Sequence, residues 1–292
     1  MNKVIAIGEI VWDCLPSGKQ LGGAPLNFAF FAKVLGADAY AVSAVGNDVL
    51  GDETLAVAAT TGVCLDYVQR NSLPTSRVLV TLSDAGIPQY EIVEGVAWDA
   101  IDVAEDALKL VKDASVICWG SLAQRTEKSR ESVLAFLDAA PDTCIKVFDI
   151  NIRQHYYSRD VIEASLKRSN ILKLNEDELP LVAQMLGVDG NEKEIVSSLM
   201  DMYSLKYLIY THGADFSEVY SADGEYSHIP TPKVSVADTV GAGDSFTAVF
   251  VTSLLSGKSV KESHNLAVEV SAFVCTQNGA INPLPDYIRT NF

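Results

Sequence analysis

The stretch Asp238-Thr239-Val240-Gly241-Ala242-Gly243-Asp244-Ser245-Phe246 decides how this chain is interpreted. Its glycine-rich turn runs directly into an apolar helical pattern, so a helix should begin inside the stretch. The first turn of a helix presents backbone N–H groups without partners and the positive end of the helix dipole. Both features favour phosphate oxygens, and the carboxylate of Asp244 stands beside them. A phosphate site next to a base for a hydroxyl proton is what phosphoryl transfer to an alcohol requires.

Outward from this turn, short β-branched runs alternate with helical patterns along almost the whole chain. We expect strands at 3–8, 40–45, 76–82, 114–119, 145–150, 170–174 and 206–211, and helices at 24–35, 49–61, 127–139, 159–168, 191–202, 242–256 and 260–276. Such alternation predicts an α/β fold with a mostly parallel central sheet and helices on both faces. No repeat or low-complexity linker divides the 292 residues, which favours one domain, 1–292.

Two stretches interrupt this alternation, residues 10–23 and 72–98. Each holds strand-like pieces joined by turns, with no helical pattern between them. They predict either a small β-sheet that projects from the main sheet or a pair of edge hairpins.

The composition excludes several classes of partner and compartment. A net charge of −16 argues against binding to nucleic acid or to an anionic membrane. No apolar run reaches membrane-spanning length, and no signal-peptide pattern precedes the first strand. The five cysteines are scattered without a C-x-x-C spacing, so we expect reduced thiols and a cytoplasmic protein. The four histidines show no metal-ligand spacing.

Two glycine motifs are interpreted as structural. Gly257-Lys258-Ser259 resembles the end of a P-loop, but position 252 is Thr and the segment follows a helix. It therefore predicts a helix that ends at a glycine. Gly8 follows a strand but lacks the further glycines of a dinucleotide fingerprint, which disfavours an oxidoreductase.

Several polar groups besides the 238–246 stretch have the chemistry of a binding site. In Leu21-Gly22-Gly23-Ala24-Pro25-Leu26-Asn27, paired glycines allow close backbone approach to a ligand and the amide of Asn27 both donates and accepts. Glu178, in Asn175-Glu176-Asp177-Glu178, either helps to hold Mg²⁺ or is an acidic residue in a first helical turn. Arg153, after a buried strand, either contacts a ligand or holds its loop through Asp149.

These motifs together resemble the ribokinase-like (PfkB) carbohydrate kinases over residues 3–285. The motifs on which this resemblance rests are D-T-x-G-A-G-D at 238–244, G-G-x-x-x-N at 22–27, N-x-x-E at 175–178, T-x-G at 211–213 and D-x-N-x-R at 149–153. The T-x-G match is incomplete, because Asp215 and Phe216 stand where a further glycine is usual. The runs at 8–13, 21–25 and 95–99 resemble the bacterial fructokinase branch.

The resemblance implies a ribokinase-like three-layer fold with a β-sheet lid at 10–23 and 72–98, ATP as phosphoryl donor and Mg²⁺. It implies that Asp244 is the catalytic base and that the amides of Gly241, Ala242 and Gly243 form an anion hole. It assigns sugar binding to Asp13, Gly22, Gly23, Asn27 and Arg153, nucleotide binding to Asn175, Thr211, Gly213 and Asn278, Mg²⁺ through water to Glu178, and a monovalent cation such as K⁺ to Asp238 near Val240 and Gly279.

The substrate that we expect is a neutral hexose, D-fructose, phosphorylated on its 6-hydroxyl. Residues 87–99 carry Glu91, Glu94 and Asp99 and no Lys or Arg, whereas an anionic substrate would need cationic partners there. Arg77 and Arg153 keep an anionic sugar open, such as 2-keto-3-deoxygluconate. Another sugar or nucleoside kinase, a sugar-sensing protein on the same fold and a homodimer formed through the lid also remain open.

Overall fold

The computed structural model describes residues 2–15, 18–82 and 88–289, and two sheets organise this part of the chain. The larger sheet has nine strands in the order β13-β12-β11-β10-β9-β8-β1-β4-β5, and the smaller has four in the order β3-β2-β6-β7. No helix in the described ranges has the length and apolar character to cross a membrane.

The strands of the large sheet are β1 (Lys3–Ile7), β4 (Asp38–Gly46), β5 (Cys64–Asn71), β8 (Val116–Trp119), β9 (Ile145–Asp149), β10 (Ile171–Asn175), β11 (Tyr207–His212), β12 (Phe216–Ser221) and β13 (Tyr226–Pro230). The helices are α1 (Ala24–Val34), α2 (Val49–Ala59), α3 (Glu105–Val111), α4 (Glu127–Asp138), α5 (Arg159–Leu166), α6 (Glu178–Leu186), α7 (Glu192–Tyr203), α8 (Ala242–Leu255), α9 (Val260–Cys275) and α10 (Asp286–Arg289).

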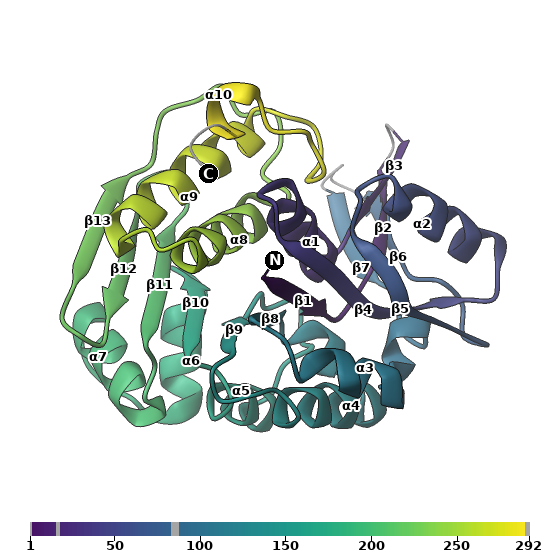
Figure 1. Ribbon diagram of the computed structural model, residues 1–292, viewed down its shortest axis with the longest axis horizontal. Helices are drawn as coiled ribbons and strands as arrows, with labels where there is room; N and C mark the ends of the chain where they lie inside the picture. Colours follow the sequence, from purple (N-terminus) through teal and green to yellow (C-terminus); the bar gives the residue numbers. More distant parts are fainter. Residues whose placement is uncertain (1, 16–17, 83–87, 290–292) are drawn as a thin grey trace.

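The central strands are parallel, and helices cover both faces of the sheet (Figure 1). Alternate residues of β1 enter opposite cores: Val4 and Ala6 pack with α1, α8 and α9, whereas Ile5 and Ile7 pack with α3 to α7. A strand buried on both faces needs apolar residues at every position, and β1, KVIAI, has them after its first residue. This confirms the predicted three-layer α/β architecture.

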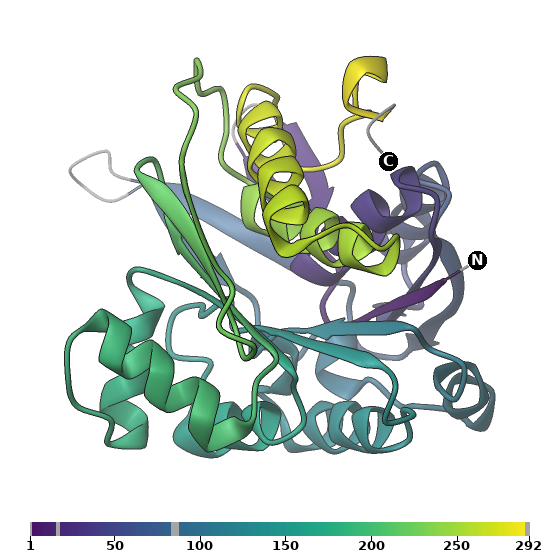
Figure 2. The ribbon, with the colours of Figure 1, turned by 60° about the vertical axis from the view of Figure 1, so that its left-hand side comes forward.

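The small sheet consists of β2 (Val11–Leu15), β3 (Gly18–Gly22), β6 (Arg77–Leu82) and β7 (Pro88–Ile92). It projects beside α2, away from the helices α5 to α7 (Figures 1 and 2). Trp12 ties it to α2 through a hydrogen bond from its indole nitrogen to Thr54 Oγ1 at 2.7 Å. The stretches 10–23 and 72–98 therefore form one separate sheet, not two edge hairpins, and positions 83–87 lie outside the described residues.

The predicted helices and central strands are present, but edge elements were missed. The strands β5, β12 and β13 and the helices α3, α6 and α10 were not predicted. Strand β13, YSHIP, has an exposed alternate face, and β5, CLDYVQRN, is mostly polar, so neither shows a continuous apolar run. Gly257 follows α8 with a φ of 85°, which agrees with the predicted helix end at a glycine.

Candidate active site

The 238–246 stretch forms the turn and first residues of α8. Gly241 is the N-cap of the helix with φ 80°, and a Cβ there would lie 2.4 Å from the Cβ of Ala280. The amide of Ala242 donates to the carbonyl of Thr239 at 3.3 Å. In the described part of the chain, the amides of Gly241, Gly243 and Asp244 have no acceptor, so this helix start offers donors for an anion.

Asp244 points from the first turn of α8 toward α1. Its Oδ2 accepts a hydrogen bond of 2.8 Å from the side-chain nitrogen of Asn27. Burial, followed by the nearby carboxylate of Asp149, raises the pKa of Asp244 to about 6, although the Asn27 bond and the charges of Lys173 and Arg153 oppose the shift. Such a pKa suits a carboxylate that accepts a proton near neutral pH.

Of the residues expected to bind sugar, Asn27 contacts this carboxylate directly, and Asp13, Gly22 and Gly23 lie on β2, on β3 and at the start of α1. Asn27 is 2% exposed, and its Oδ1 has no hydrogen-bond partner among the described residues. Asp13 lies on β2, and a Cβ on Gly22 of the paired strand would be 3.5 Å from its Oδ2. Gly23 caps α1 with φ 112°, and a Cβ there would lie 2.4 Å from the carbonyl oxygen of Glu9, so this turn requires glycine.

Glu9 is a buried carboxyl group that the sequence analysis did not assign to the site. It is 3% exposed, and its Oε2 has no hydrogen-bond partner within the described residues. Burial raises its pKa to about 7, with a further contribution from Asp244. The signals in the sequence were a glutamate two residues after an apolar strand and its place in the run 8–13.

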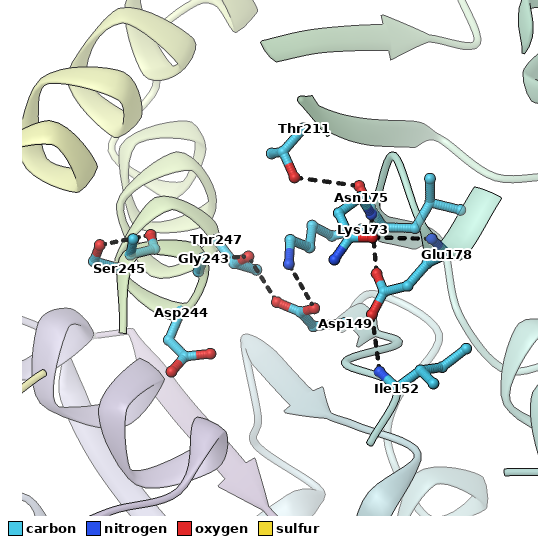
Figure 3. Close-up of polar contacts among 12 residues, drawn as sticks. Asp149, Ile152, Lys173, Asn175, Glu178, Thr211, Gly243, Asp244, Ser245 and Thr247 are labelled. Atoms are coloured by element: carbon cyan, nitrogen blue, oxygen red, sulfur yellow. Dashed lines mark hydrogen bonds and ion pairs between the residues drawn. The ribbon is translucent and has the colours of Figure 1, made fainter. Parts of the chain in front are cut away.

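Three further polar side chains connect the sheet to α8, and of these only Asp149 belongs to a motif noted in the sequence (Figure 3). Lys173 Nζ lies 3.1 Å from Asp149 Oδ1, and Thr247 Oγ1 donates to Asp149 Oδ2 at 3.0 Å. All three side chains are buried, with Lys173 7% exposed. Burial alone would lower the pKa of Lys173, but the carboxylates of Asp149 and Glu178 raise it above its ordinary value, so the ammonium stays charged.

The N-x-x-E motif caps α6. The side-chain oxygen of Asn175 accepts from the amide of Glu178 at 2.9 Å, and Glu178 Oε2 accepts from the amide of Asn175 at 2.9 Å. Glu178 Oε1 accepts from the amide of Ile152 at 2.8 Å, which ties α6 to the loop after β9. Glu178 is therefore fixed in the first turn of α6 by amide donors to both of its oxygens, and its part in holding Mg²⁺ stays a prediction, while Glu176 and Asp177 are exposed.

The predicted nucleotide residues lie at two places. Thr211 is on β11, where its hydroxyl lies 3.5 Å from the carbonyl of Leu174, and Gly213 follows that strand with φ 40°. With Asn175 they gather at the carboxyl ends of β10 and β11, the edge where ligands of parallel sheets bind. Asn278 is exposed after α9, one residue before the turn that lies against α8.

Asp238 holds two turns together. Its Oδ1 accepts from the amide of Val240 and its Oδ2 from the amide of Gly279, both at 3.0 Å. The carbonyl of Gly279 accepts from Asn282 Nδ2 at 2.6 Å. These oxygens already bind protein donors, and the role of Asp238 beside a monovalent cation stays a prediction.

The structure shows the partners of two arginines near the expected sugar side, Arg153 and Arg125. Arg153 does not hold its loop through Asp149: it is exposed, and its guanidinium donates to the carbonyl of Ile152 at 3.0 Å. Arg125, which lies outside the 87–99 stretch, donates to both oxygens of Asp99 at 2.6 and 2.7 Å. Arg125 also donates to the carbonyl of Val93, so its charge is used within the protein.

The arrangement suits phosphoryl transfer. It brings the unpaired amides at the start of α8 together with the Asp244 carboxyl, whose pKa is raised to about 6, and the side-chain amide of Asn27 on α1. In the ranges that the structure describes, no group of three or more His, Cys, Asp or Glu side chains could enclose a metal ion.

Comparisons with known proteins identify relatives. The family model described as pfkB family carbohydrate kinase matches residues 8–287. The fructokinase of Escherichia coli is 29% identical over 97% of this chain and 96% of its own length. The ATP-dependent 6-phosphofructokinase of Thermoanaerobacterium thermosaccharolyticum is 28% identical over 97% of this chain and 91% of its own.

Solved structures show the same fold. The fructokinase from Xylella fastidiosa with bound ATP has a TM-score of 0.86 at 21% identity and covers 99% of this chain and 97% of that one. The fructokinase from Vibrio cholerae O395, bound to fructose, ADP and calcium ion, has a TM-score of 0.82 at 20% identity, with 100% and 99% covered.

Proposed function

The chain belongs to the pfkB family of carbohydrate kinases, and we propose that it transfers the γ-phosphoryl group of ATP to the 6-hydroxyl of D-fructose. The observation that carries this proposal is the pairing of Asp244 with unpaired amides at one helix start. With both groups in one turn, the base can accept the proton of the alcohol while the anion site binds the phosphoryl group of the donor.

In the reaction, the hydroxyl oxygen forms a bond to the γ-phosphorus as the bond from that phosphorus to the β,γ-bridging oxygen breaks. Asp244 takes the hydroxyl proton, and Asn27 holds the carboxylate in place. The amides of Gly241 and Gly243 donate to the oxygens of the transferring group, and Ala242 can join them if it gives up its bond to Thr239. Bound Mg²⁺ would offset the charge of the phosphates, with Glu178 holding its water ligands.

The sugar would lie between the small sheet and α1. We assign its hydroxyl contacts to Asp13, Gly22, Gly23 and Asn27, and one oxygen contact to Arg153. Asn175, Thr211, Gly213 and Asn278 are assigned to the nucleotide, and Asp238 to the turn that a monovalent cation would stabilise.

A neutral sugar is supported by the charges of the described side chains. Asp13 and Asp244 are acceptors for hydroxyls, and Arg125 is committed to Asp99. Arg153 remains as the one exposed cation among the assigned sugar residues. The relatives named fructokinase support fructose, whereas the one named 6-phosphofructokinase makes fructose 6-phosphate the main competitor.

The test is a panel of acceptors with coupled ADP detection and Mg-ATP as donor: fructose, fructose 6-phosphate, 2-keto-3-deoxygluconate, ribose and a nucleoside. We expect kcat/KM to be highest for fructose, and phosphorus NMR of the product to show a 6-phosphate ester. As a matched control, 6-deoxyfructose should bind but not react. Preference for any other acceptor would refute the fructose assignment, and binding without turnover of any acceptor would favour a sugar sensor.

A further inference from the structure

A charged side chain lies inside the active site on a central strand. Lys173 is on β10 between Leu172 and Leu174, both 0% exposed, and is itself 7% exposed. A buried charge is costly unless it is paired and hydrogen-bonded. Its partner is Asp149, the last residue of the neighbouring strand β9.

This ion pair is fixed to the helix that carries the catalytic turn. Thr247, 0% exposed, donates to the free oxygen of Asp149 and lies 3.0 Å from the carbonyl of Gly243. The chain of contacts therefore runs from Lys173 through Asp149 and Thr247 to the first turn of α8 (Figure 3).

The ammonium has unused bonding capacity at this place. It has three N–H donors, and among the described residues only Asp149 accepts one of them. A Cβ placed on Gly243 would lie 3.0 Å from Nζ, so the ammonium borders the turn whose amides lack acceptors. Asp244, on the other side of that turn, also experiences its charge.

A purely structural role does not explain this placement. Buried ion pairs are often replaceable by apolar residues with little loss of stability. A cation beside unpaired amides, however, suits the charge that a transferring phosphoryl group carries on its oxygens.

We propose that Lys173 is a catalytic residue whose ammonium donates a hydrogen bond to an oxygen of the γ-phosphoryl group, with Asp149 and Thr247 as positioning residues. The inference rests on the proposed function and extends it to a further residue. Lys173 keeps its proton throughout: the hydroxyl proton goes to Asp244, and only the bonds at the γ-phosphorus change.

The first test compares nucleotide binding by calorimetry, with the ATP analogue AMP-PNP and with ADP, both with Mg²⁺. Lys173→Met should weaken AMP-PNP binding about ten- to a hundredfold, the value of a charge-assisted hydrogen bond, and ADP binding less than about threefold. Lys146→Met, on the neighbouring strand β9, is the matched control and should change neither. Equal weakening of both nucleotides by Lys173→Met would overturn the proposal.

The second test separates catalysis from stability. Lys173→Met leaves Asp149 buried without its partner, so the double variant Lys173→Met/Asp149→Asn should recover thermal stability. We expect its kcat to stay about 10²- to 10³-fold below wild type, because the donor to the transferring group is still missing. Recovery of kcat together with stability would overturn the proposal and leave a structural ion pair.

The two proposals fail in different ways. If the wild-type protein binds both nucleotides but does not phosphorylate fructose, the sugar assignment is wrong and the AMP-PNP comparison still decides the role of Lys173. If AMP-PNP binds the wild-type protein no more tightly than it binds Lys173→Met, the contact with the γ-phosphoryl group is refuted whichever sugar reacts.

Discussion

Asp244 combines a position at a helix start, a side-chain hydrogen bond from Asn27 and a pKa raised to about 6. The isosteric change Asp244→Asn keeps the shape and removes the base. We expect kcat to fall about 10³-fold, within the usual contribution of general base catalysis, while the Kd for fructose changes little. Steady-state kinetics with calorimetry checks both values. A variant that keeps a tenth or more of the wild-type kcat would show that Asp244 is not the base.

The raised pKa of Asp244 also predicts a pH dependence. Below about pH 6 the carboxyl is protonated and cannot accept the hydroxyl proton, so kcat/KM should fall tenfold for each further pH unit. Activity is therefore retained above the pKa and lost as the pH falls through it. Burial raises the pKa of Glu9 to about 7, so Glu9 is already mostly neutral where Asp244 titrates, and Glu9→Gln should leave this acid limb in place. A clear shift of the acid limb in Glu9→Gln would contradict the assignment of this limb to Asp244.

At the residue scale, contiguous motifs were predictable and isolated residues were not. Asp244, Gly241 and Gly243 belong to one turn whose chemistry can be interpreted from neighbours in the sequence. Lys173 belongs to the short run ILKLN. A lysine inside an apolar strand suggests a buried charge, but the sequence does not show which residue pairs with it. Its partner Asp149 is on another strand, and only the sheet register places them together.

At the element scale, the N-terminus of α8 depends on the backbone of Gly241. Its φ of 80° is unfavourable for residues with a Cβ, and a Cβ would also meet Ala280 at 2.4 Å. Gly241→Ala should therefore displace the turn and lower kcat by about tenfold or more, since misplaced anion-hole donors lose transition-state stabilisation.

A double variant tests how much the contact with Ala280 contributes to the loss of kcat expected for Gly241→Ala. In Gly241→Ala/Ala280→Gly the contact with the Cβ of Ala280 is removed, while the backbone strain and an approach of 2.9 Å to the Cα of residue 280 remain. We expect partial recovery of kcat, measured beside the thermal midpoint of each protein. Wild-type kcat in Gly241→Ala alone would mean that the turn tolerates displacement and does not hold the phosphoryl group.

The strands that could not be predicted from the sequence lie mostly at or next to the edges of the large sheet. The central strands are buried on both faces and show apolar runs, whereas β12 and β13 form an antiparallel extension with polar residues on one face. Glu218 on β12 illustrates the difficulty: its carboxylate accepts hydrogen bonds from Tyr220 and Tyr226, so a charged residue lies in a strand through partners that the sequence alone does not reveal.

At the scale of the whole molecule, the residues that we assign to the site come from both the large sheet with its helices (the body) and the small sheet. The small sheet supplies Asp13, while the side-chain oxygen of Gln20 on β3 would lie 2.7 Å from a Cβ on Gly279 of the body. Most strands and helices of the large sheet and the strands of the small sheet were predictable from the hydrophobic pattern of the sequence. The approach of β3 to the turn after α9 was not predictable, because it brings together residues more than 250 positions apart in the sequence.

This placement predicts that ligands tighten the small sheet more than the body. Fructose with AMP-PNP should slow amide hydrogen exchange in β2 and β3, since both ligands would lie beneath these strands and bridge them to α1 and α8. The strands β1 and β8, in the centre of the large sheet, are the internal control and should change little. Exchange measured by mass spectrometry with each ligand alone should give a smaller effect than with both. Unchanged exchange in β2 and β3 with both ligands bound would show that the small sheet is a fixed wall of the site and not a lid.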